Sequence, residues 1–186
     1  MDLQGETTKR SAPSSPNPPP HWGDEGYTGL MAIDLKAYAR GEIEQVCEIF
    51  LKDIAALSDD ALKTSPGGAA RAPYSIMLEL VILNKRFAKR LRGEDPGPFD
   101  PKAWDNVPED FQNRETATQQ FKDTIADLLA AFEAVPDNEI DREIPTQTGK
   151  TTPFELVMFC FSHIGYHDGQ LNYLQALNGD AEIHWH

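Results

Sequence analysis

Four stretches of this chain repeat apolar residues at intervals of three and four positions, the spacing that places side chains on one face of an α-helix. The pattern predicts helices over about 41–57, 73–91, 111–134 and 152–179. Few segments show the alternation typical of a strand. Because amphipathic helices of this length bury their apolar faces against one another, we predict an all-α four-helix bundle with long connecting loops.

The ends of the predicted helices carry their own signals. Thr152, Pro153 and Glu155 stand at the N-cap, first and third positions of the last helix, which is the pattern of a capping box. Gly93 and Gly179 follow the second and fourth helices, where glycine commonly ends a helix. The apolar faces of the first three helices are Ile43, Val46, Cys47, Phe50 and Ile54; Ile76, Leu80, Leu83, Phe87 and Leu91; and Phe121, Ile125, Leu128, Leu129 and Phe132.

The domain organisation follows from composition along the chain. Residues 1–26 are rich in Pro, Ser and charge and contain a Pro-rich run that cannot hold a helix, so we predict a disordered or extended tail. Residues 27–186 are then one domain, since a chain of 186 residues with 40% hydrophobic content can bury one sizeable core.

Charge and cysteine usage limit the classes of partner. A net charge of -13, from 17 basic and 30 acidic residues, argues against a nucleic-acid partner. The sequence has no apolar signal segment and no apolar run long enough to cross a bilayer. Its two cysteines, Cys47 and Cys160, fall within apolar helical faces and are predicted to be buried thiols. We therefore expect a soluble cytoplasmic protein with no membrane partner.

The residues best suited to chemistry are His163 and His167. They lie four positions apart on a predicted helix, so both imidazoles lie on one face and can bind a zinc-class or iron-class ion, given a third ligand. The spacing is common, and the alternative is two histidines packed in a helix interface with their N–H groups satisfied. Spacing alone does not decide between the two interpretations.

Glu79 is the strongest candidate for the third ligand. It follows Ile76 by three residues and precedes Leu83 by four, which places its carboxylate on the core side of the second helix. A buried carboxylate must be neutralised, paired with a base or bound to a metal. The alternative is that Glu79 lies at the edge of the apolar face and pairs with Arg71, Lys85 or another surface base.

Other polar residues near this predicted site have weaker assignments. Tyr166 and Gln170 partly share the face of His163 and could orient water or substrate, although packing roles explain them as well. Asn84 is either an outer partner of Glu79 or an amide facing the bundle. Asp168 follows His167 directly, so we expect it to point away to the surface.

The C-terminal segment contains two further histidines, His184 and His186. If extended, the residues after the last helix are long enough to reach back toward the predicted site or toward a neighbouring subunit. Reach does not establish ligation, and we favour Trp185 closing a groove over either histidine acting as a ligand.

The run HIGYHDGQLNYLQ resembles the last-helix metal motif, HxxxHxGQL, of the DinB-like superfamily, bacterial proteins also described as metal-binding four-helix bundles. The resemblance covers about 41–179. It implies His163 and His167 as metal ligands. Members place another His on the second helix, commonly followed five residues later by Glu, His or Asn. Here Glu79 and Asn84 fit that spacing, which implies Glu79 as the third ligand and departs from the usual histidine.

The resemblance also sets expectations for activity. Characterised relatives include thiol-dependent transferases and isomerases, and many other members are only described as metal-dependent hydrolases. The resemblance therefore implies an enzyme acting on a small molecule, with Zn, Ni or Fe and a low-molecular-weight thiol as cofactors. We expect a homodimer. An open divalent ion can lower the pKa of water or hold a thiol as thiolate. The alternative is a non-catalytic bundle that binds a metal or ligand.

Overall fold

The fold is described from a computed structural model, which places residues 33–146 and 149–185. Five α-helices, one short 3-10 helix and one β-hairpin make up this part of the chain. In chain order they are α1 (Leu35–Ala56), α2 (Asp59–Lys63), α3 (Pro73–Leu91), α4 (Arg114–Glu133), η1 (Asp137–Glu139), β1 (Ile144–Thr146), β2 (Gly149–Thr151) and α5 (Pro153–Leu177).

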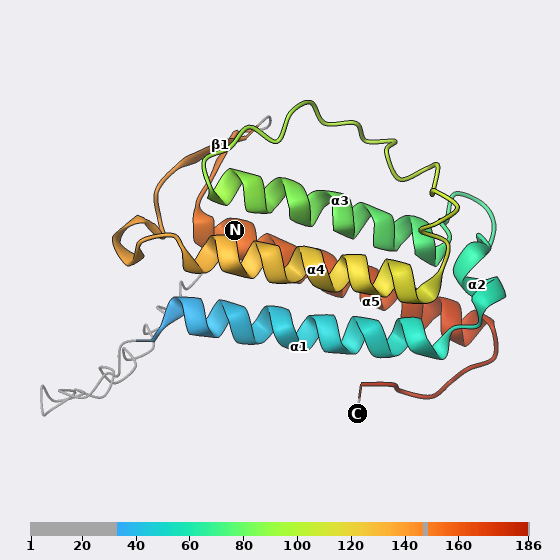
Figure 1. Cartoon of the computed structure of the whole chain (residues 1–186). Coiled ribbons are helices and arrows are strands. Elements are labelled where there is room, and N and C mark those ends of the chain that lie inside the picture. The colour runs from blue at the N-terminus through green and yellow to red at the C-terminus, as the bar shows by residue number, and fades with distance from the viewer. Residues whose placement is uncertain (1–32, 147–148, 186) are drawn as a thin grey trace, which may run out of the picture. The chain divides into compact units, whose positions relative to one another are not determined.

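The four long helices follow an up-down-down-up order. The colour gradient of Figure 1 shows α1 and α5 running one way and α3 and α4 running the other. Since α3 and α4 are parallel, the chain must return along the whole bundle between them, a distance of about 28 Å at roughly 1.5 Å per helical residue. Residues 92–113 make this crossing, which explains the unusual length of that loop.

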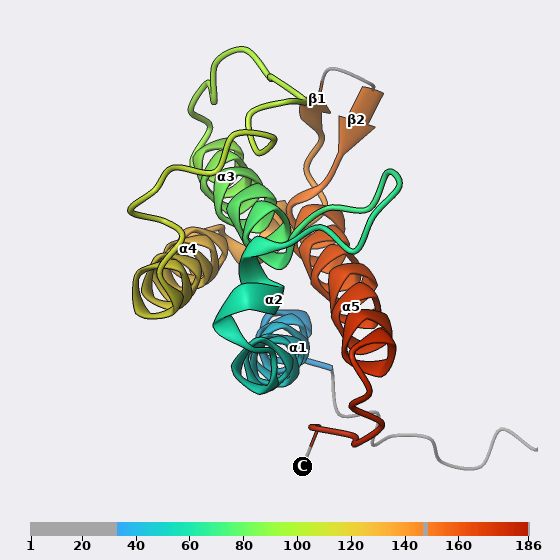
Figure 2. The same ribbon diagram turned by 90° about the vertical axis from the view of Figure 1, so that its right-hand side faces the viewer.

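The helices pack mainly as two pairs, α1 with α5 and α3 with α4, and contacts between α3 and α5 join the pairs. Figure 2 shows the four helices from one end, with α3 and α1 on opposite sides of the bundle. Their inward faces bury one continuous core that includes Phe50, Leu80, Phe121 and Ile164. The predicted all-α four-helix bundle is confirmed.

Two of the predicted helices agree closely with the structure. The second spans the predicted residues, and the fourth begins with the predicted capping box, in which Thr152 and Glu155 each accept a backbone N–H. The other two differ at their first residues. Helix α1 starts at Leu35, before the predicted 41, because the Asp34 carboxylate caps it and the helix continues through Gly41. Helix α4 starts at Arg114 because Asn113 caps it.

The periodicity did not predict the short elements. Helix α2 has five residues and begins at the Ser58 cap. The antiparallel hairpin pairs Ile144 with Thr151 and Thr146 with Gly149. Three-residue strands and a single helical turn are too short to show a period, so a sequence pattern has little with which to detect them.

The apolar face of α3 is also wider than predicted. Ile76, Leu80 and Leu91 are buried as expected, but Leu83 and Phe87 are only half-buried. Every residue from Pro73 to Val81 is buried instead. The N-terminal half of α3 is enclosed by its neighbours on all sides. A pattern that assumes one buried face underestimates how many residues such a helix buries.

No helix among the described residues is long and apolar enough to cross a membrane. The predicted N-terminal tail, residues 1–26, lies outside the described residues, so the proposed division into a tail and a 27–186 domain stays a prediction.

Candidate metal centre

Glu79, His163 and His167 meet between α3 and α5, with their ligand atoms all within 4.8 Å of one another. The two Nε2 atoms are 2.9 Å apart. Glu79 Oε1 lies 3.4 Å from His163 Nε2, and Glu79 Oε2 lies 3.3 Å from His167 Nε2. The three predicted residues therefore lie together, and no other His, Cys, Asp or Glu cluster of this kind occurs in residues 33–146 and 149–185.

The helices hold these side chains in place. His163 and His167 are one turn apart on α5, so both project toward α3. The His167 side chain is 2% exposed and that of His163 is 13% exposed. The Phe159 ring stacks on His163 with centroids 5.7 Å apart, and the Tyr166 ring meets His167 edge-on at 5.1 Å. These contacts restrict the rotation of both imidazoles.

Gln170 determines which nitrogen of His167 faces the cluster. Its Oε1 lies 2.8 Å from His167 Nδ1, and an amide oxygen can only accept a hydrogen bond. With an ion bound between Glu79, His163 and His167, His167 Nδ1 would donate its proton to Gln170, and Nε2 would present a lone pair to the ion. This is the usual outer-shell arrangement of a metal-binding histidine. The structure thus gives Gln170 a contact with His167, whereas the sequence suggested a role in orienting water or substrate.

Arg71, which precedes α3, also contacts Glu79, donating a hydrogen bond from Nη2 to Oε2. Both interpretations of Glu79 are thus realised in one geometry, since it faces the histidines and pairs with Arg71. Burial by itself raises the pKa of Glu79, but hydrogen bonds from His163, His167 and Arg71, together with the Arg71 charge, lower it below its usual range. The carboxylate is ionised at neutral pH and can serve as a ligand.

The donor set fits a divalent ion of the zinc, iron or nickel class. Two imidazole nitrogens bound at about 2.0–2.1 Å to one ion lie roughly 3 Å apart, and the observed separation of the Nε2 atoms is 2.9 Å. A carboxylate completes a set of three ligands, which leaves further positions for water or substrate. Arg71 can remain an outer partner of Glu79, because a carboxylate has lone pairs for both a metal and a guanidinium.

We predict that Gln170→Ala weakens metal affinity by about 10- to 100-fold, the usual effect of removing the outer partner of a metal-binding histidine. The loss follows because His167 is then free to turn or change tautomer. Competition titration with a chromophoric chelator measures the change. Gln119→Ala is the control, because Gln119 is an exposed residue of α4 that bonds to Asp123 and not to a cluster residue. Equal affinity in wild type and Gln170→Ala would show that packing alone fixes the imidazole.

Asn84 faces the bundle, and among the described residues its hydrogen-bond partner is Cys160 and not Glu79. It accepts a hydrogen bond from Cys160 Sγ at 3.1 Å, and its Nδ2 is buried without a partner among the described residues.

Cys47 and Cys160 are buried free thiols, as predicted. Burial, with a smaller effect of Glu44, raises the pKa of Cys47 to about 12, and burial also raises the pKa of Cys160. Neither thiol can act as a thiolate nucleophile at neutral pH.

The expected surface position of Asp168 is wrong. Asp168 is 6% exposed and lies against Asp53 of α1, itself fully buried, on the side of α5 that faces α1. Asn172 donates to Asp53 Oδ2 at 2.7 Å, and Gln175 donates to its backbone oxygen at 2.9 Å. Adjacent residues on a helix point about 100° apart, so the neighbour of a buried histidine can meet a different helix. Sequence periodicity gave no signal for Asp53.

Burial, with the neighbouring Asp53 carboxylate, raises the pKa of Asp168 to about 7. An acid whose pKa is higher in the folded chain stabilises the fold fully below its unfolded pKa of about 4, and this stabilisation is lost as the pH rises through about 7. We predict that the metal-free chain loses stability between pH 4 and 8. Asp168→Asn, which resembles the protonated acid, should be more stable than wild type at pH 8, by about 1–3 kcal/mol.

Urea unfolding of the metal-free chain at pH 5 and pH 8 measures this effect. Asp110→Asn, at an exposed position, serves as the matched control and should follow the wild-type profile. If Asp168→Asn has the same pH profile as wild type, then Asp168 is ionised throughout the range and the interpretation fails.

The C-terminal residues lie apart from the cluster. His184 Nε2 is 2.8 Å from Asp180 Oδ2, and His184 is not part of the group of potential ligands. Trp185 is 51% exposed, and its expected role in closing a groove stays a prediction. His186 lies outside the described residues.

A cavity of about 760 Å³ lies beside the cluster, and both Gln170 and Arg71 line it. Tyr166, 64% exposed, lines it too. A ligand in this cavity would contact the residues that hold His167 and Glu79. The geometry therefore combines a set of metal ligands with an adjoining space for a small molecule.

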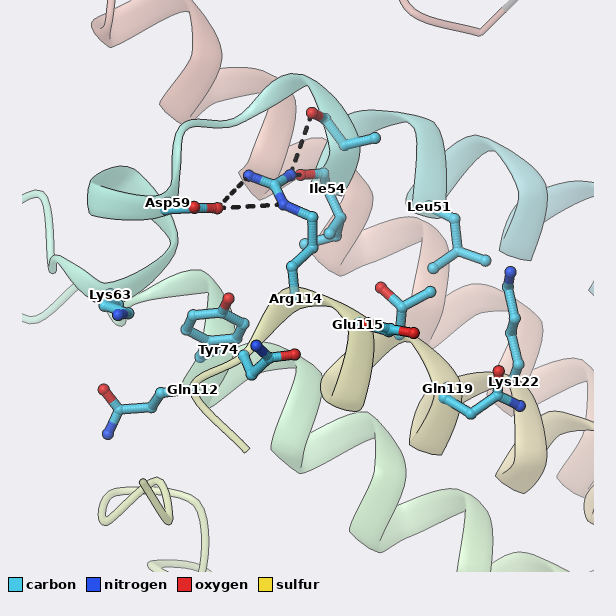
Figure 3. Close-up of a pocket in the computed structure, with 13 residues that line it drawn as sticks. Leu51, Ile54, Asp59, Lys63, Tyr74, Gln112, Arg114, Glu115, Gln119 and Lys122 are labelled. Atoms are coloured by element: carbon cyan, nitrogen blue, oxygen red, sulfur yellow. Dashed lines mark hydrogen bonds and ion pairs between the residues drawn. The ribbon is translucent and has the colours of Figure 1, made fainter. Parts of the chain in front are cut away.

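A second cavity, of about 680 Å³, lies near the C-terminal end of α1 and is drawn in Figure 3. The Arg114 guanidinium lines this cavity, but its donors are used in hydrogen bonds within the fold. It donates to the carbonyls of Ile54 and Leu57 at 2.7 Å each and to Asp59 Oδ1 at 2.7 Å. These bonds satisfy the last carbonyls of α1, where a cation is favourable. Arg114 thus joins α4 to the end of α1, and the described residues that line this cavity include no cluster of potential metal ligands.

Comparison with known proteins agrees with this architecture. A family model described as the DinB superfamily matches residues 80–171, a segment that contains both histidines and begins one residue after Glu79. No curated protein gave a match. Among solved structures, the mycothiol-dependent maleylpyruvate isomerase is similar with 12% identity and a TM-score of 0.57, over 73% of this chain and 60% of that chain.

A DinB-like protein from Bacillus subtilis is similar with 15% identity and a TM-score of 0.54, over 78% of this chain and 95% of that one. At such identities these likenesses establish the fold alone. The chain spans less than two thirds of the isomerase, whereas it spans nearly the whole of the Bacillus protein. The family match and both structures confirm the resemblance drawn from the sequence motif.

Proposed function

Because this chain belongs to the DinB superfamily, we propose that it is a metal-dependent enzyme that acts on a small molecule together with a low-molecular-weight thiol. The convergence of Glu79, His163 and His167 beside an open cavity is the observation that carries this proposal. These three residues would hold the ion, and Gln170 would hold His167 in the ligating tautomer. The bound ion would supply Lewis acidity, which lowers the pKa of water or of a thiol.

A thiol from outside the chain suits this site because the chain offers no cysteine nucleophile. Both cysteines are buried, and burial raises the pKa of each. The similar mycothiol-dependent isomerase also supports a thiol-linked reaction. Tyr166 lies at the edge of the His167 ring with most of its surface exposed, so its hydroxyl can orient a bound molecule. Hydrolysis with water as nucleophile and non-catalytic binding are the alternatives.

A thiol titration of the cobalt-substituted protein tests the proposed function. We expect low-molecular-weight thiols to add a sulfur-to-cobalt charge-transfer band, because a thiolate is a good ligand for an ion with open positions. His167→Ala supplies the control for cobalt bound elsewhere and should show no such band. A spectrum that responds to pH but not to thiols would favour a hydrolase. A spectrum indifferent to thiols, pH and small anions would favour the non-catalytic binder.

A further inference from the structure

We propose that Arg71 recognises a carboxylate in the cavity beside the metal ligands, so that the molecule bound there is a small organic acid with an apolar or aromatic body. This inference rests on the proposed function, because it assigns the substrate class of the same site. It is carried by the walls of the cavity, by their charge and by the hydrogen-bonding capacity of Arg71.

The cavity has two walls, the loop between α2 and α3 and one face of α5. Figure 2 shows that loop, residues 64–72, projecting alongside α5. The loop is bonded to itself, with Ser65 Oγ donating to the Ala70 carbonyl at 2.7 Å and Ala70 N donating to the Gly67 carbonyl at 3.2 Å. Gly67 and Gly68 both have positive φ, which allows the tight turn. The volume of about 760 Å³ is suited to a small molecule.

The α5 wall is apolar and largely uncovered. Tyr166, Tyr173 and Leu177 line the cavity, and each is more than half exposed, at 64%, 66% and 58%. Ile76 and Leu174 form its floor from buried positions. Large apolar side chains gathered around a concave surface mark a ligand site more often than isolated ones do. This wall therefore favours a ligand with an apolar or aromatic body.

Charge gives the other half of the specificity. Among the described residues that line this cavity, Arg71 is the one that carries a charge, and none is a carboxylate. That composition contrasts with a chain that carries 30 acidic and 17 basic residues. The charged group of the ligand should therefore be an anion, because Arg71 attracts it to this cavity whereas the acidic residues elsewhere on the chain would repel it.

Arg71 keeps donors in reserve for such an anion. A guanidinium has five N–H donors, and here Nη2 bonds to Glu79 while Nη1 is buried without a partner among the described residues. The Arg71 side chain as a whole is 30% exposed and lines the cavity, so its remaining donors can turn toward a bound anion. The group also lies over the Trp104 ring, 5.8 Å from its centroid, which holds its plane. An oriented guanidinium with spare donors matches a planar carboxylate better than a neutral amide. Binding an acid would satisfy the donors that Arg71 leaves unpaired.

Calorimetric titration of the full chain, metal-free and zinc-loaded, with phenylacetate, phenylacetamide and phenyl phosphate tests the proposal. We expect phenylacetate to bind at least about tenfold more tightly than phenylacetamide, the effect of a hydrogen bond to a charged group. Arg71→Gln should remove that preference in both forms, and Arg71→Lys should retain part of it. Tyr173→Ala should weaken both ligands equally. Arg92→Gln, which alters an exposed pair with Asp127, is the matched control and should bind as wild type does.

Zinc content, measured on every variant by elemental analysis, separates this inference from the proposed function. Loss of the acid preference in metal-free Arg71→Gln supports the inference even if the chain binds no metal. Equal binding of acid and amide by wild type, or an unchanged preference in a folded Arg71→Gln, would overturn it. Tighter binding of phenyl phosphate than of phenylacetate would also overturn it, because the site would then select phosphate.

Discussion

Replacing either histidine of the cluster, as His163→Ala or His167→Ala, should lower zinc affinity by more than about 100-fold. Removing a residue that hydrogen-bonds to a metal ligand already lowers metal affinity by about 10- to 100-fold, and these substitutions remove a ligand itself. Two remaining ligands hold an ion weakly because most of its shell is then water. The Nε2 atoms of the two imidazoles lie 2.9 Å apart, and His184, the other histidine among the described residues, pairs with Asp180 outside the cluster.

Competition titration against a chromophoric chelator measures these affinities, and circular dichroism checks that each variant folds. His184→Ala is the matched control, since His184 pairs with Asp180 away from the cluster and should bind zinc as wild type does. Tight zinc binding by a folded double variant of His163 and His167 would show that the ion binds elsewhere.

Glu79→Gln should weaken zinc affinity by at least about tenfold, because a neutral amide is a poorer ligand than an ionised carboxylate. Glu79→His should bind more tightly than Glu79→Gln, since it supplies a third imidazole at the position where the superfamily commonly has histidine. Glu133→Gln is a matched control, because Glu133 also pairs with an arginine, Arg40, but lies on the surface of α4. Zinc affinity unchanged in Glu79→Gln would mean that Glu79 serves only as the partner of Arg71.

The long helices and two of the three cluster residues were the most predictable features of the sequence. Apolar spacing and end signals located α3 and α5 because both a buried face and a cap leave local patterns. The position of His167 next to His163 on one face required only the helical repeat. Glu79 was placed on the core side by the same argument, and the structure shows it 9% exposed.

The tertiary partners were not predictable in the same way. Asp53 and Asp168 meet across α1 and α5, 115 positions apart in the sequence, and no local period relates them. The Arg71 contact was anticipated only as an alternative to metal ligation, because a linear pattern cannot show one carboxylate facing two histidines and a guanidinium together. The α2–α3 loop that walls the cavity owes its position to turn geometry at Gly67 and Gly68.

X-ray absorption spectroscopy of untagged, zinc-loaded protein, combined with elemental analysis, tests most directly whether Glu79, His163 and His167 form one metal centre. We predict one zinc ion per chain, with two imidazole nitrogens and carboxylate oxygen at about 2.0–2.2 Å, and loss of the imidazole signal in the double variant of His163 and His167. A chain that retains no zinc after dialysis, or zinc whose shell is the same in that double variant, would contradict the assignment.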